Sequence, residues 1–562
     1  MPAKINLKDK KYFNQRKASM KTERDSFIPH WKDLSKFGQP RRGRFLVSDV
    51  NKGSPKYSSI INSRATIATR TAAAGLVAGV MSPSRPWYQL GTFDPGMMQF
   101  KPVKEWLNTA ELTMREIFAA GNLYKMAPTM ASELLLFGTG SMSQVDDNQD
   151  ISRFFTHTIG SYSVAQNERL EIDTYCREYL RTVAQIMGEF GYNNASQPIK
   201  ALYDKGDYDK TSTIVHYVEP NPFFKEGSPF AKHAAFRSVK YELGEDNQRG
   251  SNSGYIKESG FKRFPFFTPR YETTGEDIYG TNCPGMVALG DVKQLQTQEK
   301  RKAQGIDKQV NPPLHGPASL KNVPISSMPG GLNLYDSDPN GNTLRPVYEV
   351  TPDVAALSMD MDRVEARINE VFFVDLFMAI TNMRGIQPKN EMELAERNAE
   401  RLLQLGPLLE SIHGEFLNPL IDNTFDRMIE LDMLPPPPQE LAGQPLKISY
   451  VSTLAKAQKS VETGGVERVA GFVSALVEGG KAEALDKLDA DKAIDIYADA
   501  VGTPPSIIRS AEEVAEIRQK RAEQQERQRR LEQENMASET AGNLAEADMS
   551  GDNALTRATA NG

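Results

Sequence analysis

A short polar loop is the strongest candidate in this sequence for contact with a charged ligand. Residues 381–390 separate two stretches of helical spacing and carry two cations and no acid. Side chains of this kind can touch phosphates without reading a base sequence. If the loop faces a lumen, these contacts would come from Asn382, Arg384, Gln387 and Lys389. An ordinary solvated turn between two helices has the same composition, so both interpretations stay open.

Motifs for catalysis or cofactor binding are incomplete. The run Gly479-Gly480-Lys481 lacks the upstream glycine of a phosphate-binding loop and is followed by Ala482. Residues 250–254 carry asparagine where a nucleophile elbow needs serine. Asp360 and Asp362 would point to different faces of a helix, which favours solvated carboxylates over a metal site. We therefore predict no catalytic residue, no metal site and no cofactor.

The composition indicates a globular protein with several cores. The chain has 562 residues, of which 39% are hydrophobic and 25% charged. Its net charge of -6 argues against a protein that coats nucleic acid. It does not exclude a channel that DNA passes through without binding. Affinity rises with each phosphate neutralised, and tight binding would slow the passage of DNA. A basic turn, Arg41-Arg42-Gly43-Arg44, is either a solvated loop or a contact with DNA or a partner.

Cysteine usage and hydropathy limit the compartment. Cys176 and Cys283 lie far apart without metal-ligand spacing, so we predict no disulfide framework and a reducing compartment. The most apolar stretch, residues 72–81, is too short to span a bilayer. We therefore expect no membrane partner.

Two long helices frame a central loop. One helix is predicted over 284–310 and a second over 353–380. In the second, apolar residues alternate steps of three and four, which suits lengthwise packing against another helix. Thr351 would cap this helix, with Pro352 in the first helical position. The intervening residues 311–351 are too many for a simple connection and predict a small functional lobe.

The remaining pattern predicts an α+β fold that is mainly α. Runs of β-branched and aromatic residues predict strands, and apolar residues at steps of three and four predict helices. The helices cover 7–38, 57–81, 102–119, 123–138, 174–190 and 391–432, with kinks at Pro407 and Pro419. The strands begin at 87 and cover 214–218, 236–243 and 446–451.

The C-terminal region predicts a highly charged helix over 512–534. Acidic and basic residues four positions apart can stabilise such a helix. It lacks a face to bury in its own chain, so it would project into solvent or pack against copies of itself. After Met536 the composition predicts a disordered tail.

Several of these segments resemble the portal, or head-to-tail connector, proteins of short-tailed bacteriophages. The resemblance covers roughly residues 10 to 500. Its most specific part is the run Tyr279-Gly280-Thr281-Asn282-Cys283-Pro284-Gly285, where Cys283 stands in place of the serine usual in the family. The other segments that carry it are 64–90, 136–140, 173–179, 288–313, 406–407 and 415–420.

The resemblance implies a portal-type ring subunit, usually one of twelve, at one vertex of an icosahedral head. Double-stranded DNA would enter and leave through the axial channel. The expected division is wing 1–280, stem helices 281–310 and 352–380, clip 311–351, tunnel loop 381–390, kinked wing helix 391–439, crown 440–510, C-terminal helix or barrel 511–536 and disordered tail 537–562.

The same resemblance implies partners and a location. The partners would be other copies of this chain, major capsid and scaffolding proteins, the packaging terminase, and tail adaptor proteins that bind the clip 311–351. The protein would be made in the host bacterial cytoplasm and reside at the portal vertex of the virion. Two alternatives stay open: a tail adaptor or other virion structural protein, and an enzyme on a helical scaffold.

Overall fold

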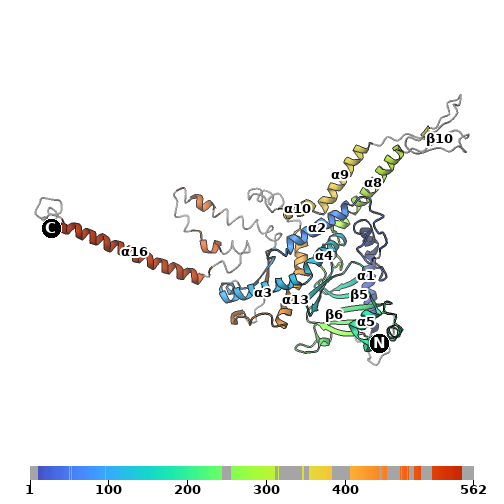
Figure 1. Ribbon diagram of the computed structural model, residues 1–562, viewed down its shortest axis with the longest axis horizontal. Coiled ribbons are helices and arrows are strands. Elements are labelled where there is room, and N and C mark those ends of the chain that lie inside the picture. Colours follow the sequence, from blue (N-terminus) through green and yellow to red (C-terminus); the bar gives the residue numbers. More distant parts are fainter. Residues whose placement is uncertain are drawn as a thin grey trace.

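The computed structural model combines helical layers with antiparallel sheets (Figure 1). It describes residues 10–49, 51, 53–94, 96–243, 255–310, 314–315, 345–346, 353–382, 405–441, 446–451, 469, 471–476, 479, 487–494, 509 and 511–546. Within this part of the chain, none of the helices combines the length and the apolarity needed to cross a membrane. The mixed helix and sheet composition agrees with the predicted fold class.

The N-terminal half contains the helices of the central core. They are α1 (Lys10–Phe37), α2 (Arg64–Val80), α3 (Lys101–Ala120) and α4 (Leu123–Phe137). The prediction for α2 began too early, at 57. Polar side chains explain the later start, since Ser63 occupies the N-cap position and the Asn62 side chain accepts from the backbone nitrogen of Arg64. Gly138 ends α4 in the left-handed conformation, with φ of 83°.

A five-stranded antiparallel sheet forms the lower part of the molecule in Figure 1. Its order is β4-β5-β6-β7-β8. The strands are β4 (Tyr162–Gln166), β5 (Ile172–Thr182), β6 (Thr211–Pro220), β7 (Phe236–Glu242) and β8 (Lys257–Phe261). Strand alternation separates its two faces. Phe13 and Met20 of α1 pack on the face that carries Tyr217, whereas Trp31 belongs to the core on the face that carries Tyr175.

The helix predicted over 174–190 is wrong for its first half. Residues up to Thr182 belong to β5, and only α5 (Val183–Phe190) is helical. The β-branched and aromatic residues of this segment pair with β4 on one side and β6 on the other. The side chain of Thr182 then accepts from the backbone nitrogen of Gln185 in a capping box, which starts α5 at that point.

Smaller sheets connect distant parts of the chain. β2 (Met142–Asp147) lies between β3 (Ile151–Thr156) and β9 (Phe266–Phe267). β1 (Tyr88–Thr92) pairs with β12 (Leu446–Tyr450) in an antiparallel ribbon. Both of these ribbon strands are predicted from the sequence, but their pairing across more than 350 positions is not. A short helix, α6 (Gln197–Asp204), follows α5.

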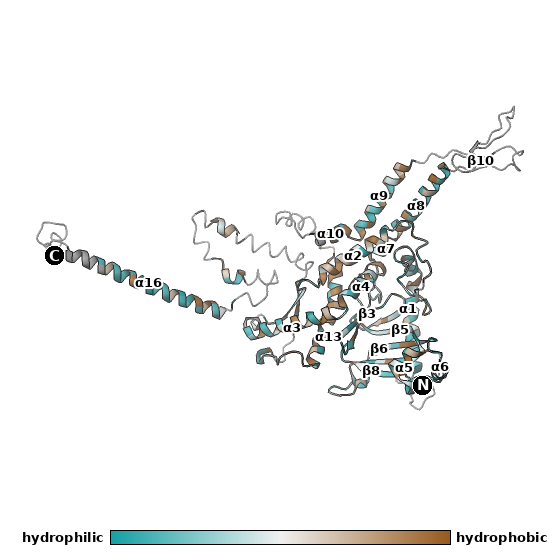
Figure 2. Ribbon diagram, viewed as in Figure 1, coloured by the Kyte–Doolittle hydropathy of each residue, from teal (hydrophilic) through white to brown (hydrophobic). Residues whose placement is uncertain are grey.

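The C-terminal half adds α12 (Gly406–Ile412), a π-helical turn (His413–Leu417) and α13 (Asn418–Glu430). The irregularity predicted at Pro419 takes the form of this π-helical turn, because Pro419 has no amide hydrogen for the carbonyl of Glu415. Pro407 lies in the first turn of α12, and the part of the predicted helix before Leu405 lies outside the described residues. Figure 2 shows the apolar residues concentrated where α2, α4 and α13 meet.

The last described helix, α16 (Ala511–Glu546), extends away from the body as an isolated rod (Figure 1). It continues ten residues beyond the predicted boundary at 536, so the prediction of a disordered tail is wrong for 537–546. Ala537, Ala541 and Leu544 favour helix and explain the extension. Residues 547–562 lie outside the described part.

Glu111 on α3 fastens the β1–β12 ribbon to the helical core. Its carboxylate accepts a hydrogen bond from the backbone nitrogen of Leu90, at 2.6 Å. Burial raises the pKa of Glu111 to about 7. The folded protein therefore keeps a proton on this carboxyl between about pH 4.5 and pH 7 that the unfolded chain releases.

The contribution of Glu111 to stability must consequently fall as pH rises through that window. We predict that Glu111→Gln, which keeps the acceptor for Leu90, raises the free energy of unfolding at pH 8 by about 1–3 kcal/mol, from about 1.4 kcal/mol per pKa unit. The gain should shrink as pH falls through this window and vanish below about pH 4.5. Thermal unfolding at several pH values measures this, with Glu105→Gln on the exposed side of α3 as control. A gain that does not change with pH would contradict the assignment.

Candidate functional site

A helical hairpin projects from the body and is the most distinctive feature of the described chain (Figure 1). It consists of α7 (Pro284–Val287), α8 (Leu289–Val310) and α9 (Val354–Val371). The helix predicted over 284–310 is confirmed, except for a brief interruption at Ala288. Cys283 is buried at the N-cap of α7, and Pro284 occupies the first turn.

The two long helices bury an apolar seam only near the body. Val292 and Leu295 on α8 belong to the same core as Val364 and Ile368 on α9. Polar contacts flank this seam: Arg367 donates to Asp291 Oδ1 at 2.8 Å, and Gln298 donates to Asp360 Oδ2 at 2.5 Å. The half of the seam nearest the body is therefore a rigid, packed element of this chain.

The distal half of the hairpin leaves large apolar side chains uncovered. Val310 on α8 is 69% exposed and Met359 on α9 is 61% exposed, and Ile306 and Leu357 are also exposed. Leu357 is one of the apolar residues whose spacing predicts lengthwise packing against another helix, and within the described residues it is exposed. Exposed apolar residues that follow one element are typical of surfaces covered in an assembly.

One buried side chain fixes the base of the hairpin to the segment before α2. Gln296 on α8 is 5% exposed. Its oxygen accepts from the backbone nitrogens of Ile61 and Asn62, at 2.6 and 2.9 Å, and its nitrogen donates to the carbonyl of Asn62 at 2.7 Å. The Asn62 side chain donates in turn to Glu365 on α9, at 2.9 Å. Both helices are thus held by the same short segment.

The helix predicted over 353–380 is interrupted. α9 ends at Val371, and α10 (Val374–Asn382) continues after two residues in a turn. Phe373 has a φ of 51°, in the left-handed region that a bulky residue adopts only when its surroundings demand it. Phe372 and Phe377 are buried in the core, so burial of aromatic side chains explains the turn.

The N-terminus of α9 also differs from the prediction. Its N-cap is Asp353, whose side chain accepts from the backbone nitrogen of Ala356 at 2.9 Å. Thr351 and Pro352, predicted as cap and first residue, lie outside the described residues. Of residues 311–351, the structure describes only β10 (Leu314–His315) and β11 (Arg345–Pro346), which pair antiparallel.

α10 leads from the hairpin into the predicted ligand loop. Asn382 is the last residue of α10, whereas Arg384, Gln387 and Lys389 lie outside the described residues. α10 packs against α2 at Gly75, where a Cβ atom would overlap the side chain of Phe377. The described structure thus positions the start of the loop firmly, and the prediction for its side chains stays a prediction.

The titratable groups of the described residues do not form a catalytic constellation. Burial raises the pKa of both thiols, Cys176 and Cys283, to about 12, which leaves them as poor nucleophiles at neutral pH. Within the same residues, no cluster of three or more His, Cys, Asp or Glu side chains could hold a metal ion. Asp360, one of the two carboxylates considered from the sequence, instead accepts from Gln298.

A buried ion pair that sequence reasoning missed supports the core below the hairpin. Arg270, 5% exposed, pairs with Glu415 in the π-helical turn. Its guanidinium also donates to the carbonyl of Leu170 at 2.7 Å and to Gln166 Oε1 at 3.0 Å. Such a network satisfies a buried charge and fixes the π-helical turn next to β9. An isolated arginine in the sequence carries no signal for this role.

Comparisons with known proteins cover nearly the whole chain. The family model described as bacteriophage head to tail connecting protein matches residues 10–508. A portal protein of Salmonella phage epsilon15 is 41% identical over 541 residues, which are 96% of each chain. A probable portal protein of Bordetella phage BPP-1 is 40% identical over 553 residues, which are 98% of each chain.

Solved structures show a weaker likeness. The alignment with a chain from the neck of an empty gene transfer agent particle spans 77% of this chain and 93% of that chain, with 10% identity and a TM-score of 0.31. A chain from the virion of a native gene transfer agent particle covers 75% and 92%, with 11% identity and a TM-score of 0.29. Likeness at this level supports no conclusion about this chain.

The hydrogen bonds of Gln296 predict how substitutions at this position change the free energy of unfolding. Gln296→Ala removes partners from two backbone nitrogens and one carbonyl, and should lower the free energy of unfolding by about 2–4 kcal/mol, since each unpaired buried group costs about 1–3 kcal/mol. Gln296→Glu keeps an acceptor for the two backbone nitrogens but sets an oxygen against the Asn62 carbonyl and buries a charge, so it should also destabilise the protein. Thermal unfolding at fixed protein concentration and scan rate measures both.

The matched control is Gln294→Ala, which makes the same change at an exposed position of α8. If Gln296→Ala lowers the unfolding temperature no more than this control does, Gln296 does not anchor the hairpin.

Proposed function

This chain belongs to the bacteriophage head to tail connecting protein family, and we propose that it is the portal protein at the head–tail junction of a short-tailed phage. The observation that carries this function is the similarity to portal proteins over almost the entire length of the chain. A portal is structural: identical subunits form a ring at one capsid vertex, and double-stranded DNA passes through the ring when the genome is packaged and ejected.

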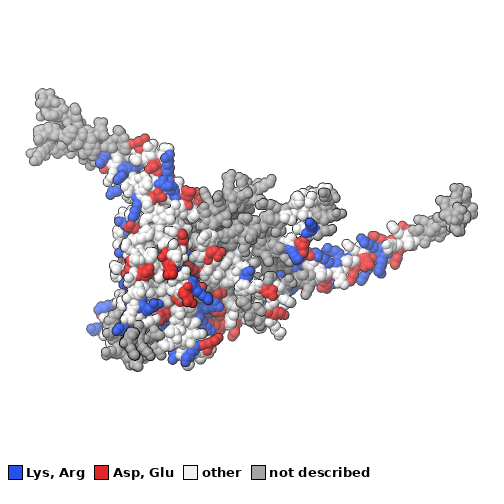
Figure 3. Space-filling view, turned by 180° about the vertical axis from the view of Figure 1, so that it is seen from behind, with Lys and Arg blue, Asp and Glu red and all other residues white. Residues whose placement is uncertain are grey.

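Two uncovered surfaces support assembly into a ring. The distal hairpin exposes Val310 and Met359, and α16 presents charges on all sides instead of an apolar face. Figure 3 shows acidic and basic side chains alternating along α16. In a closed ring, each subunit offers two different faces to its neighbours, so surfaces that are exposed in one chain can be buried by the next. We propose twelve subunits, the number implied by the family resemblance.

The hairpin is the element best suited to the channel wall. Its base is locked to the core through Gln296, and its helices are long enough to form a tube when repeated around an axis. In this proposal 281–310 and 352–380 are the stem, and 381–390 is the tunnel loop. A chain with a net charge of -6 and a few cations at the tunnel loop would let DNA slide without gripping it.

The remaining segments are assigned to the parts of a portal subunit that the family resemblance implies. Residues 1–280 and 391–439 would form the wing, 440–510 the crown, and α16 a barrel around the axis. Residues 311–351 would form the clip that binds tail adaptor proteins and, earlier, the packaging terminase. Capsid and scaffolding proteins would surround the ring at the portal vertex. The packaging ATPase would be a separate protein, so this chain needs no catalytic site of its own.

The purified full-length protein should assemble into a ring of identical subunits. Twelve chains of 62.5 kDa would give a particle of about 750 kDa, which mass photometry can measure directly. Negative-stain images should show rings with a central hole. Monomers in the presence of capsid and scaffolding proteins, the partners most able to promote assembly, would contradict the portal function.

The proposed role of the tunnel loop in DNA passage can be tested by substitution. Replacing Arg384 and Lys389 by alanine should leave the ring intact, because a protruding loop contributes little to packing. Removing two cations should change how much DNA is packaged or retained, since each phosphate contact contributes to DNA affinity. Genome content per particle, measured by quantitative PCR of protected DNA, tests this. Unchanged genome content and phage yield would show that these side chains do not contact DNA.

A further inference from the structure

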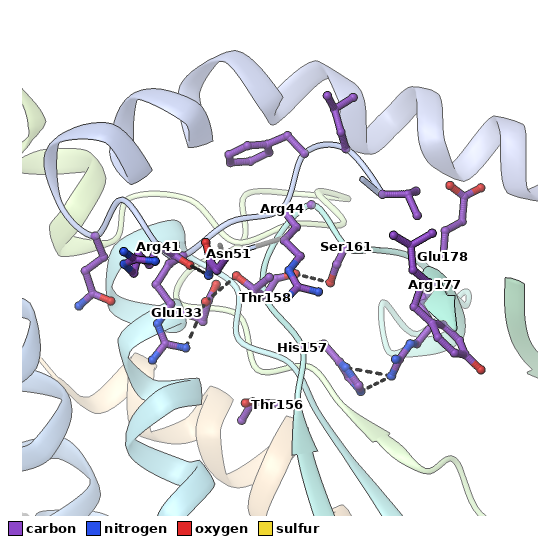
Figure 4. A pocket seen from close by; sticks show the side chains of 18 of the residues that line it. Arg41, Arg44, Asn51, Glu133, Thr156, His157, Thr158, Ser161, Arg177 and Glu178 are labelled. Carbon is purple, nitrogen blue, oxygen red and sulfur yellow. Dashed lines mark hydrogen bonds and ion pairs between the residues drawn. The ribbon is translucent and has the colours of Figure 1, made fainter. Parts of the chain in front are cut away.

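A strongly basic pocket lies away from the hairpin, between α1, the loop 41–51 and β5 (Figure 4). Its volume is about 970 Å³. Eight Lys and Arg residues line it against two acids, Glu133 and Glu178. Six of these residues are Arg41, Arg42, Arg44, Arg70, Arg177 and Arg181. The basic turn noted in the sequence therefore meets further arginines from α2 and β5.

Both acids of the pocket already have partners. Glu133 is fully buried and accepts from Thr158 Oγ1 at 2.8 Å and from the backbone nitrogen of Ile159 at 3.1 Å, with Arg42 at 3.7 Å. Glu178 pairs with Lys17 on α1, at 2.8 Å. These carboxylates hold the walls of the pocket together. Arg24 and Arg181 pair with Asp25 and Glu189, at 2.6 and 3.8 Å. Among the described residues, no carboxylate forms an ion pair with Arg44, Arg70 or Arg177.

Arg177, on β5, shows this lack of an ion-pair partner most clearly. Arg177 and Arg181 lie on the ring of Tyr179, with guanidinium carbons 4.4 and 5.0 Å from its centre. The polar contacts of Arg177 are to the ring nitrogens of His157, at 3.0 and 3.2 Å, and among the described residues no carboxylate forms an ion pair with it. Burial lowers the pKa of His157 well below its usual value, so this histidine is neutral.

Arg181 is partly exposed and forms an ion pair with Glu189 Oε2, at the long distance of 3.8 Å. Its Nε atom is buried and makes no hydrogen bond within the described structure. An anion in the pocket would supply a hydrogen-bonding acceptor that this ion pair does not provide. The outer arginines Arg44 and Arg70 are exposed at the rim, where they can close on such an anion.

We infer that this pocket binds the phosphate groups of a nucleotide or of a short single strand of nucleic acid. A terminal phosphate or a triphosphate carries more charge and more acceptor oxygens than a carboxylate, and a strand brings one charge at each phosphodiester, so a short ligand can neutralise the pocket within its volume. Guanidinium groups match phosphate geometry with paired hydrogen bonds, and seven of the eight cations are arginines. Tyr57, 41% exposed on the pocket wall, can stack on a base.

This site is distinct from the proposed channel. It involves none of the residues of the hairpin or of the loop 381–390, and its arginines come from α1, the loop after it, α2 and β5. The proposal therefore does not depend on the portal function, and ring formation and pocket binding can be tested separately in the same preparation.

The test is binding of a fluorescent ~8-nucleotide oligothymidylate to the purified full-length protein, a length within the site sizes of single-strand binders. Inorganic triphosphate, ATP and an octaglutamate peptide serve as competitors. Arg44→Gln with Arg70→Gln should weaken binding by at least about tenfold, since two charge-assisted contacts are lost. Arg177→Gln should weaken it similarly. Circular dichroism and ring formation show whether each variant folds.

The matched control is Arg85→Gln with Arg169→Gln, which removes the same charge from exposed positions outside the pocket. Competition by triphosphate but not by octaglutamate supports a phosphate site. If ATP binds in a direct assay but the oligothymidylate does not, the ligand is a free nucleotide. If both bind, the pocket also accepts nucleic-acid strands. Equal competition by octaglutamate would point to an acidic peptide and overturn the inference. The inference would also be overturned by an absence of binding or by equal losses in the control variant.

Discussion

The close approach of α2 to its neighbours is the constraint on which the rest of the structure depends. α2 contacts α4, α9 and α10, and it does so with small buried residues: Ala65, Ala68, Ala72, Ala73 and Gly75. At Gly75 the backbone lies so near Phe377 that no side chain fits between them. Interiors are close-packed, so a larger residue here would force α10 outward and move the base of the hairpin.

That packed base explains how one chain can support a long, partly uncovered hairpin. The apolar residues near the body are buried against α2 and α10, and Gln296 satisfies the backbone of the segment leading into α2. Further out, Ile306, Val310 and Met359 are exposed in the part of the chain that the structure describes. The same division between a rigid core and exposed apolar ends suits a subunit whose outer surfaces are completed by its neighbours in a ring.

Local patterns in the sequence predict most elements because their signals are contained within a few residues. The hairpin helices, α4 with its terminal Gly138, and the strand Phe236–Glu242 follow from apolar spacing and glycine. The predictions fail where contacts between residues distant in the sequence determine the local structure. Residues 174–182 form a strand because β4 and β6 pair with them, and the turn at Phe373 exists because Phe372 and Phe377 are buried. The basic pocket is likewise a product of folding: only Arg41, Arg42 and Arg44 are adjacent in sequence, and further arginines arrive on β5.

The measurement that tests the account most directly is an electron cryo-microscopy reconstruction of the assembled full-length protein. The account predicts that α8 and α9 of successive subunits surround the axial channel, with Val310 and Met359 buried between neighbouring chains. It also predicts that the end of α10 at Asn382 points toward the channel. Hairpins that project from the outer rim of the ring, with those apolar residues still in solvent, would contradict it.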